Sequence, residues 1–148
     1  MKKVDSLLAD YAFYHQTRGN KACHFIGIPL IMYSLFILLR AMVISPPITA
    51  AELLILVAVI YYFVLDPKLA IGMLLISTLI DFAAFKTPDL RLGIAIMIIG
   101  WIFQSIGHAV YEKRSPAFLR NLVHLLVGPL FLLNEILHVR STSSARLR

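Results

Sequence analysis

The chain has 148 residues, of which 59% are hydrophobic and only 15% are charged. Soluble domains carry roughly a quarter charged residues, so this composition and a mean hydropathy of +0.82 exclude an ordinary soluble fold. The net charge of +6 does not indicate nucleic-acid binding, because the basic residues lie at the ends of apolar runs, where they set topology and contact lipid head groups. We expect an integral membrane protein with one domain, residues 1–148.

The first predicted element is an amphipathic helix within residues 1–24. Apolar and aromatic residues recur at three- and four-residue steps between Val4 and Tyr11, which is typical of a helix lying along a membrane surface. We expect Gly19 and Asn20 to break this helix before the apolar part of the chain begins.

Four apolar runs follow, each of 17 to 20 residues: 25–44, 48–65, 69–85 and 92–110. A full crossing needs about 20 residues, so we predict four membrane spans. The sequence Asp66-Pro67-Lys68 between the second and third runs predicts a tight turn and an antiparallel hairpin.

The last predicted element is residues 116–139, which have an apolar centre but also several polar side chains. Gly128-Pro129 is expected to interrupt this helix, which would then pack on the bundle without a complete crossing. The predicted fold class is therefore all-α: a membrane bundle of about four transmembrane helices, an N-terminal amphipathic helix and a broken C-terminal helix. The pattern does not define an oligomeric state.

Basic residues predict the orientation of the bundle. They gather before the first run and after the fourth run, at Lys2, Lys3, Arg18, Lys21, Lys113, Arg114 and Arg120. Four crossings bring both groups to one side, which the positive-inside rule makes cytoplasmic. We expect a cytoplasmic N-terminus, in the cytoplasmic membrane of a bacterium or the endoplasmic reticulum of a eukaryote.

Polar residues concentrate at the same side. They form two groups, His15, Asn20 and His24 around the start of the first span and Gln104, His108 and Glu112 at the end of the fourth. The second group has four-residue steps and so shares one helical face. Because the spans alternate in direction, we expect the two groups to meet.

Three converging imidazoles predict a metal site. Neutral imidazole binds divalent iron, zinc or copper, so we expect His15, His24 and His108 as ligands, with His124 as an optional further ligand. Glu112 is expected either to bind the metal or to accept a proton from a ligating histidine. The simpler alternative is that each histidine is a hydrogen-bonded residue at a helix end.

Other residues are interpreted structurally. Trp101 is expected to face lipid or to lie in the interfacial aromatic belt. Gly72, Gly93 and Gly100 are expected to allow close helix packing. The sequence contains no phosphate loop and no nucleophile elbow.

Two long motifs resemble a known family. They read Tyr11-x3-His15-x4-Asn20-x3-His24-x2-Gly27-x-Pro29-Leu30 and Trp101-x2-Gln104-x2-Gly107-His108-x3-Glu112-Lys113-Arg114-x-Pro116-Ala117. Their order and spacing are similar to those of the small membrane family of the fungal 2-hydroxy fatty acid dioxygenase, which acts in phytosphingosine breakdown. The resemblance covers nearly the whole chain.

The resemblance implies an Fe(2+)-dependent reaction in which a 2-hydroxy fatty acid and dioxygen give a fatty acid one carbon shorter. It implies that iron is held by His15, His24 and His108. Asn20, Gln104 and Glu112 are the expected catalytic neighbours. The basic residues expected to attract the substrate carboxylate are Arg18, Lys21 and Arg114. Membrane lipids would surround the bundle, and its interior would take the acyl chain.

Two other classes of protein remain open from the residues alone. One is a haem-binding membrane protein with axial histidines from different helices, which a Soret band would reveal. The other is a non-enzymatic protein that binds or transports lipid, in which the polar cluster would hold a head group without turnover. Transporters usually place polar sites near the midplane and contain internal repeats, and neither feature is visible in the sequence.

Overall fold

The computed structural model describes residues 3–113, 115 and 122–140. Its first helix, α1 (Lys3–Phe13), buries Val4, Leu8 and Tyr11. These positions repeat every three or four residues, so one face packs against the protein. The predicted amphipathic helix is confirmed.

The predicted break at Gly19 and Asn20 is wrong. Both residues lie in the first turn of α2 (Arg18–Arg40), which begins after Thr17. The Thr17 side chain accepts a hydrogen bond from the backbone N–H of Asn20, and this N-cap starts the helix. The break lies instead between α1 and α2, at residues 14–17.

Helix α2 ends four residues before the predicted boundary at 44. Val43–Ser45 form the short strand β1, which pairs antiparallel with β2 (Ile48–Thr49). This small hairpin was not predicted, because the apolar run continues through β1 without a change in composition.

The predicted α-hairpin is confirmed. Helix α3 (Ala50–Leu65) and helix α4 (Pro67–Lys86) are joined at Asp66. The Asp66 carboxylate accepts hydrogen bonds from the backbone N–H groups of Lys68 and Leu69, and Pro67 occupies the first helical position, where its missing N–H costs nothing.

The next helix, α5 (Leu90–Ile106), begins after the cap residue Asp89. It continues as a π-helix, η1 (Gly107–Glu112). A π-helix has wider turns, bonded from i to i+5, and such segments are frequent at functional sites. His108 lies within η1.

The predicted interruption at Gly128-Pro129 is also wrong within the described residues. Helix α6 (His124–Leu137) runs through Pro129 without a break. Helices in a membrane bundle tolerate an internal proline when neighbouring helices satisfy the freed backbone groups. The beginning of the predicted 116–139 element, residues 116–121, lies outside the described residues.

Among the described residues, three helical stretches are long and apolar enough to cross a membrane: Arg18–Arg40, Pro67–Lys86 and Leu90–Glu112. Helix α3, the remaining predicted span, is shorter at 16 residues. Large apolar side chains are exposed along the bundle, including Val64, Leu75 and Leu79. The protein is an all-α membrane bundle, as the sequence predicts.

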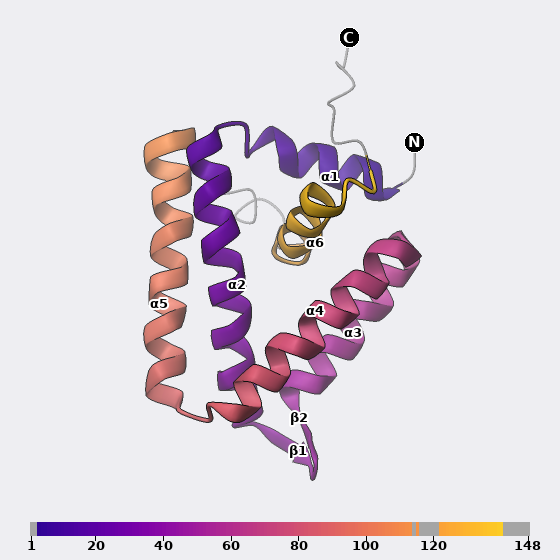
Figure 1. Cartoon of the computed structure of the whole chain (residues 1–148), viewed down its shortest axis with the longest axis vertical. Helices are drawn as coiled ribbons and strands as arrows, with labels where there is room; N and C mark the ends of the chain where they lie inside the picture. Colours follow the sequence, from indigo (N-terminus) through magenta and orange to yellow (C-terminus); the bar gives the residue numbers. More distant parts are fainter. Residues whose placement is uncertain (1–2, 114, 116–121, 141–148) are drawn as a thin grey trace.

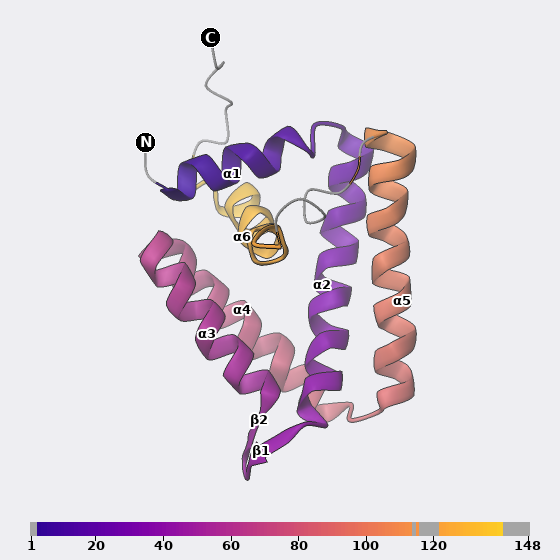
Figure 2. The ribbon, with the colours of Figure 1, turned by 180° about the vertical axis from the view of Figure 1, so that it is seen from behind.

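The helices form two pairs that diverge (Figure 1). Helices α2 and α5 lie side by side, while the α3–α4 hairpin leans away from them. Helix α6 lies between the two pairs, and α1 crosses above it (Figure 2). Both ends of the described chain lie at this end of the bundle, and the β-hairpin lies at the opposite end.

Small residues set the distance between α2 and α5. A Cβ atom on Gly100 would lie 2.7 Å from Cγ1 of Ile31 and 3.2 Å from the carbonyl oxygen of Gly27. The two backbones therefore touch at this crossing, as expected for glycine in membrane helices.

The end of α6 is tied to the rest of the bundle through Arg140. Its Nε donates to Oδ2 of Asp66 at 2.9 Å, and its guanidinium also pairs with Asp5 of α1. The backbone of Arg140 exchanges two hydrogen bonds with the Asn134 side chain. This contact joins α1, the α3–α4 turn and α6.

Candidate metal centre

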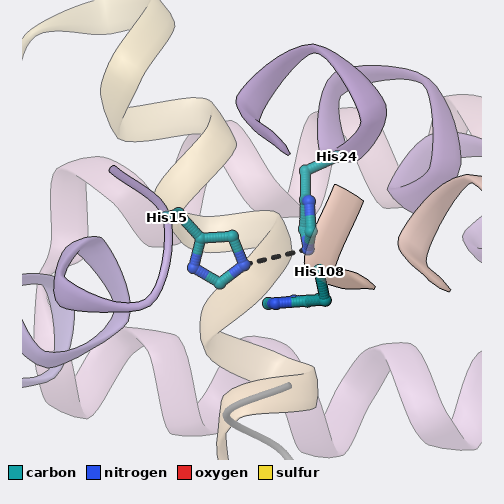
Figure 3. A group of neighbouring side chains, drawn as sticks. All are labelled: His15, His24 and His108. Carbon is teal, nitrogen blue, oxygen red and sulfur yellow. Dashed lines mark hydrogen bonds between the residues drawn. The ribbon is translucent and has the colours of Figure 1, made fainter. Parts of the chain in front are cut away.

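Three histidines meet at the end of the bundle where α1 crosses (Figure 3). His15 lies in the α1–α2 connection, His24 one and a half turns into α2 and His108 in η1. Each ring offers a nitrogen, and these three atoms all lie within 4.8 Å of one another. All three side chains are buried. The predicted convergence of the rings is confirmed.

Backbone carbonyls orient two of the rings. Nδ1 of His15 donates to the carbonyl oxygen of Tyr11 at 2.7 Å, and Nδ1 of His24 donates to that of Asn20 at 2.9 Å. A carbonyl can only accept, so each Nδ1 carries the hydrogen and each Nε2 presents a lone pair. Such contacts are how proteins fix the tautomer of ligating histidines.

The distance between these lone pairs fits a metal ion. Nε2 of His15 and Nε2 of His24 are 2.9 Å apart, and two lone pairs facing each other at this distance need a cation to be satisfied. Two nitrogens each about 2.1 Å from one ion are about 3 Å apart when they subtend a right angle. His108 adds a third donor, and its Nδ1 is buried without a hydrogen-bond partner among the described residues.

Burial keeps the site neutral. Burial, together with the neighbouring His24, lowers the pKa of His15 to about 3. The neutral ring is the form that binds metal. The Tyr11 ring stacks on His15 with 4.0 Å between centroids, and burial raises the pKa of Tyr11 well above its usual value, so its phenol stays protonated.

Glu112 contacts the beginning of α2. Its carboxylate accepts hydrogen bonds from the backbone N–H groups of Gln16 and Thr17, from the Thr17 hydroxyl and from the Asn20 amide, at 3.0–3.2 Å. A carboxylate at a helix N-terminus satisfies free N–H groups and complements the helix dipole. Glu112 thus holds η1 against the segment that carries His15 and His24.

An apolar cavity of about 470 Å³ opens beside the histidines. All three rings line it, together with Gln104 and His124. The amide nitrogen of Gln104 is buried without a hydrogen-bond partner among the described residues. Trp101, which was expected to face lipid or to lie in the aromatic belt, is half-buried and also lines the cavity.

His124 is separate from the three-histidine group. Its Nε2 lies 2.9 Å from Oδ2 of Asp10, but off the direction of a hydrogen bond, since neither ring nitrogen has an aligned partner within the described part of the chain. Its ring is 6.0 Å from that of Tyr11. His124 therefore adds a polar group to the cavity wall near the cluster.

The three basic residues predicted to attract a carboxylate are placed differently. Nζ of Lys21 pairs with Oε2 of Glu135 at 3.0 Å. Arg18 is exposed and is absent from the described cavity wall. Arg114 lies outside the described residues. The described wall of the cavity thus contains no lysine or arginine.

Two features of the site were not predicted. The first is the use of the Tyr11 and Asn20 carbonyls, for which the only signal is that each stands four residues before a histidine, the spacing of a helical turn. The second is the apolar cavity, which depends on the angle between helix pairs.

These observations define a class: a membrane helical bundle with a buried three-histidine group, suited to a first-row metal ion, beside an apolar cavity. A family model described as "2-hydroxy-palmitic acid dioxygenase Mpo1-like" matches residues 1–140. The chain belongs to this family, which agrees with the resemblance found in its motifs.

A curated relative from Saccharomyces cerevisiae is named 2-hydroxy-palmitic acid dioxygenase MPO1. It is 38% identical to this chain over 138 residues, which cover 89% of this chain and 78% of the relative. No solved structure matches the chain.

Proposed function

We propose that this protein is an iron(II)-dependent dioxygenase that oxidises 2-hydroxy fatty acids. The observation that carries the proposal is the buried group of three imidazoles at the end of an apolar cavity. A metal donor set beside an apolar space fits a lipid substrate whose polar end reacts and whose tail is alkyl. The name of the yeast relative supports the same substrate class.

The proposed reaction is balanced without a further reductant. The bond between the carboxyl carbon and the hydroxylated carbon breaks, the carboxyl carbon leaves as carbon dioxide, and the hydroxylated carbon becomes the new carboxylic acid. The substrate loses four electrons, which are the four that dioxygen accepts, and one water molecule forms.

His15, His24 and His108 would hold the iron. When bound, ferrous iron supplies the one-electron chemistry that allows dioxygen to react with an organic acid. The carbonyls of Tyr11 and Asn20 keep two of these rings in the ligating tautomer. Because the three rings are neutral, the positive charge of the ion would be offset by the negative charge of the substrate carboxylate.

Other residues of the chain would bind and orient the substrate. Gln104 and His124 offer buried N–H groups in the cavity wall, where a hydroxyl or carboxylate oxygen can accept. The remaining wall is mostly apolar, so a bound tail excludes water from the reacting end. Asn20 and Glu112 would keep the histidines in place without contacting the substrate, because the hydrogen bond between their side chains joins α2 to η1.

The site lies at the end of the bundle that carries both described chain ends. The basic residues around α1 and after η1 favour the cytoplasmic side for this end. The substrate head group would therefore lie near the cytoplasmic interface, with the tail directed toward the membrane interior.

The test is metal analysis of the detergent-purified protein and of three variants. We expect about one iron per chain in the wild type, and loss of both iron and turnover of 2-hydroxyhexadecanoic acid in His15→Ala, His24→Ala and His108→Ala. His138→Ala is the matched control, because His138 is exposed at the end of α6, and should keep both.

The outcomes separate the alternatives. Full iron content in all three variants would refute the assignment of ligands. A Soret band in the purified wild type would indicate haem instead. A protein that keeps iron and binds the acid, but consumes no dioxygen with it, would be a lipid-binding protein.

A further inference from the structure

The cavity continues far beyond the histidines along one face of α2. After His24, the lining residues of this helix are Ile28, Ile31, Met32 and Leu35. These positions follow steps of three and four residues, so they form a straight apolar stripe along the helix. The cavity is therefore elongated in the direction of α2.

A second stripe of the wall lies beside the first, on the α5–η1 helix, which packs directly against α2. Going away from His108, it consists of Gln104, Trp101 and Met97. Helices α2 and α5 lie side by side (Figure 1), and Sδ of Met97 lies 3.6 Å from Oγ of Ser34, the residue before Leu35. Leu54, from the beginning of α3, lines the same far region.

A packed apolar cluster closes the far end. Phe36, Ile37, Ala51 and Ala84 are buried together, and Leu54 packs against them. In the next turn, Arg40 pairs with Glu52 and Asp81 at 2.9 and 2.7 Å. An alkyl chain that enters from the histidines thus meets packed side chains after Leu35.

The length of this space corresponds to a single alkyl tail. His24 and Leu35 are eleven positions apart in the sequence, which corresponds to about 16 Å of helix. An extended alkyl chain advances about 1.25 Å per carbon, given C–C bonds of about 1.5 Å. The cavity therefore holds about a dozen carbons beyond the reacting end.

We propose that Leu35, Leu54 and Met97 form the end wall of an acyl tunnel and set the chain length of the substrate. This inference rests on the proposed function and specifies it: the substrate is a single-chain, unbranched 2-hydroxy acid of about 14–16 carbons. The apolar wall gives no partner to a polar group in the tail, and a cavity of about 470 Å³ has no room for a second chain.

The test changes the size of two side chains in the end wall. Each phenylalanine variant is compared with the same substitution at an exposed neighbouring position on the same helix. Leu54→Phe and Met97→Phe add volume inside the tunnel. Leu53→Phe and Ile98→Phe are the controls, because Leu53 and Ile98 are exposed and absent from the cavity wall. Leu54→Ala and Met97→Ala remove volume at the same place.

Two measurements are made on each variant. The first is kcat/KM for saturated 2-hydroxy acids from 10 to about 20 carbons, at wild-type iron content. The second is binding of saturated fatty acids without the hydroxyl group, from competition with a fluorescent fatty acid. Filling variants should lose at least about tenfold in affinity for the longest chains, since each displaced methylene loses about 0.8 kcal/mol of burial, while chains of ten or twelve carbons bind as in the wild type.

The alanine variants should accept chains one or two carbons longer, and they keep the test valid if a phenylalanine variant does not fold. The inference is overturned if the end-wall variants change all chain lengths equally, or change them no more than the controls. Turnover with an unchanged length preference refutes the tunnel but leaves the dioxygenase. If the end-wall variants change the longest fatty acid that binds, but the wild type oxidises no 2-hydroxy acid, the result supports the tunnel and refutes the dioxygenase.

Discussion

Single side chains at this site divide into those that present a ring to the cluster and those that hold the rings in place. The three converging imidazoles could be predicted, because the four-residue step from His108 to Glu112 and the alternating spans define one face and one side. The partners of Glu112 could not be predicted. Two of the four are backbone N–H groups about 95 residues earlier, and a backbone group leaves no mark in the sequence.

His124 lines the cavity without joining the cluster, and we expect it to be dispensable for the metal. His124→Gln should keep about one iron per chain, because no nitrogen of this ring belongs to the group within 4.8 Å. A second variant, His124→Leu, removes the N–H donor, and its binding of 2-hydroxyhexadecanoic acid should weaken by about tenfold or more, the value of a hydrogen bond to a charged group. His108→Gln, measured alongside by elemental analysis, should lose iron; equal loss in both glutamine variants would make His124 a ligand.

Glu112 provides a second test at this scale. Glu112→Ala removes the acceptor for the backbone N–H groups of Gln16 and Thr17, just before α2, and we expect a loss of about 1–2 kcal/mol in stability together with weaker iron binding. Asp89→Ala removes a comparable cap from α5 at the far end. It should lower the melting temperature but leave the iron affinity unchanged, and a similar loss of iron in both variants would contradict a local role for Glu112.

At the scale of elements, the helices were predictable and several of their boundaries were not. Apolar runs define where helices lie, but the start of α2 depends on Thr17 acting as a cap, and Gly19-Asn20 is compatible with either a break or a first turn. The π-helix at Gly107–Glu112 has no reliable sequence signal, since its register depends on the packing of α5 against α2.

The contact between α2 and α5 should control the site, because it sets the distance between His24 and His108. In Gly27→Ala, the added Cβ would lie 3.0 Å from the carbonyl oxygen of Gly100. A backbone atom cannot move aside, so we expect overpacking to cost about 1–3 kcal/mol and to reduce iron content.

Gly72→Ala is the control for this prediction. Its Cβ would meet the terminal Cδ2 of Leu133 at 2.7 Å, a flexible group that can rotate away. Thermal unfolding and elemental analysis of both variants check the comparison. Iron content that falls equally in the two would show that the α2–α5 distance has no special importance.

For the whole molecule, the sequence predicts a bundle but not its shape. The lengths of the apolar runs are compatible with four upright spans packed side by side and alternating in direction. The structure instead has two diverging pairs of helices with α6 between them. This arrangement creates the cavity, and it depends on contacts between distant residues such as Arg140 and Asp66, which no local pattern reveals.

The contact of Arg140 with Asp66 predicts a dependence of stability on pH. Burial alone would raise the pKa of Asp66, but hydrogen bonds from Arg140 and from the N–H of Leu69 outweigh it and hold the pKa below its usual value. A lowered carboxyl pKa stabilises the fold above the unfolded value of about 3.9, and this stabilisation disappears as the pH falls through the folded value.

Arg140→Gln should therefore lower the melting temperature at pH 7 by about 2–10 °C. The difference from the wild type should shrink when the pH falls below about 4. Arg91→Gln, at an exposed position of α5, should show no such dependence. A constant difference between wild type and Arg140→Gln from pH 7 to pH 3 would exclude this origin.

The order in which the cluster is completed follows from where its rings stand in the chain. His15 and His24 emerge early in synthesis, but the third ring belongs to η1, at the end of the last long apolar stretch of the described chain, Leu90–Glu112. A nascent chain that stops before η1 has two imidazoles and no enclosed centre. A metal held by all three rings, such as the proposed iron, would therefore bind only after η1 has been made, and it would then join α2 to the end of the α5–η1 helix.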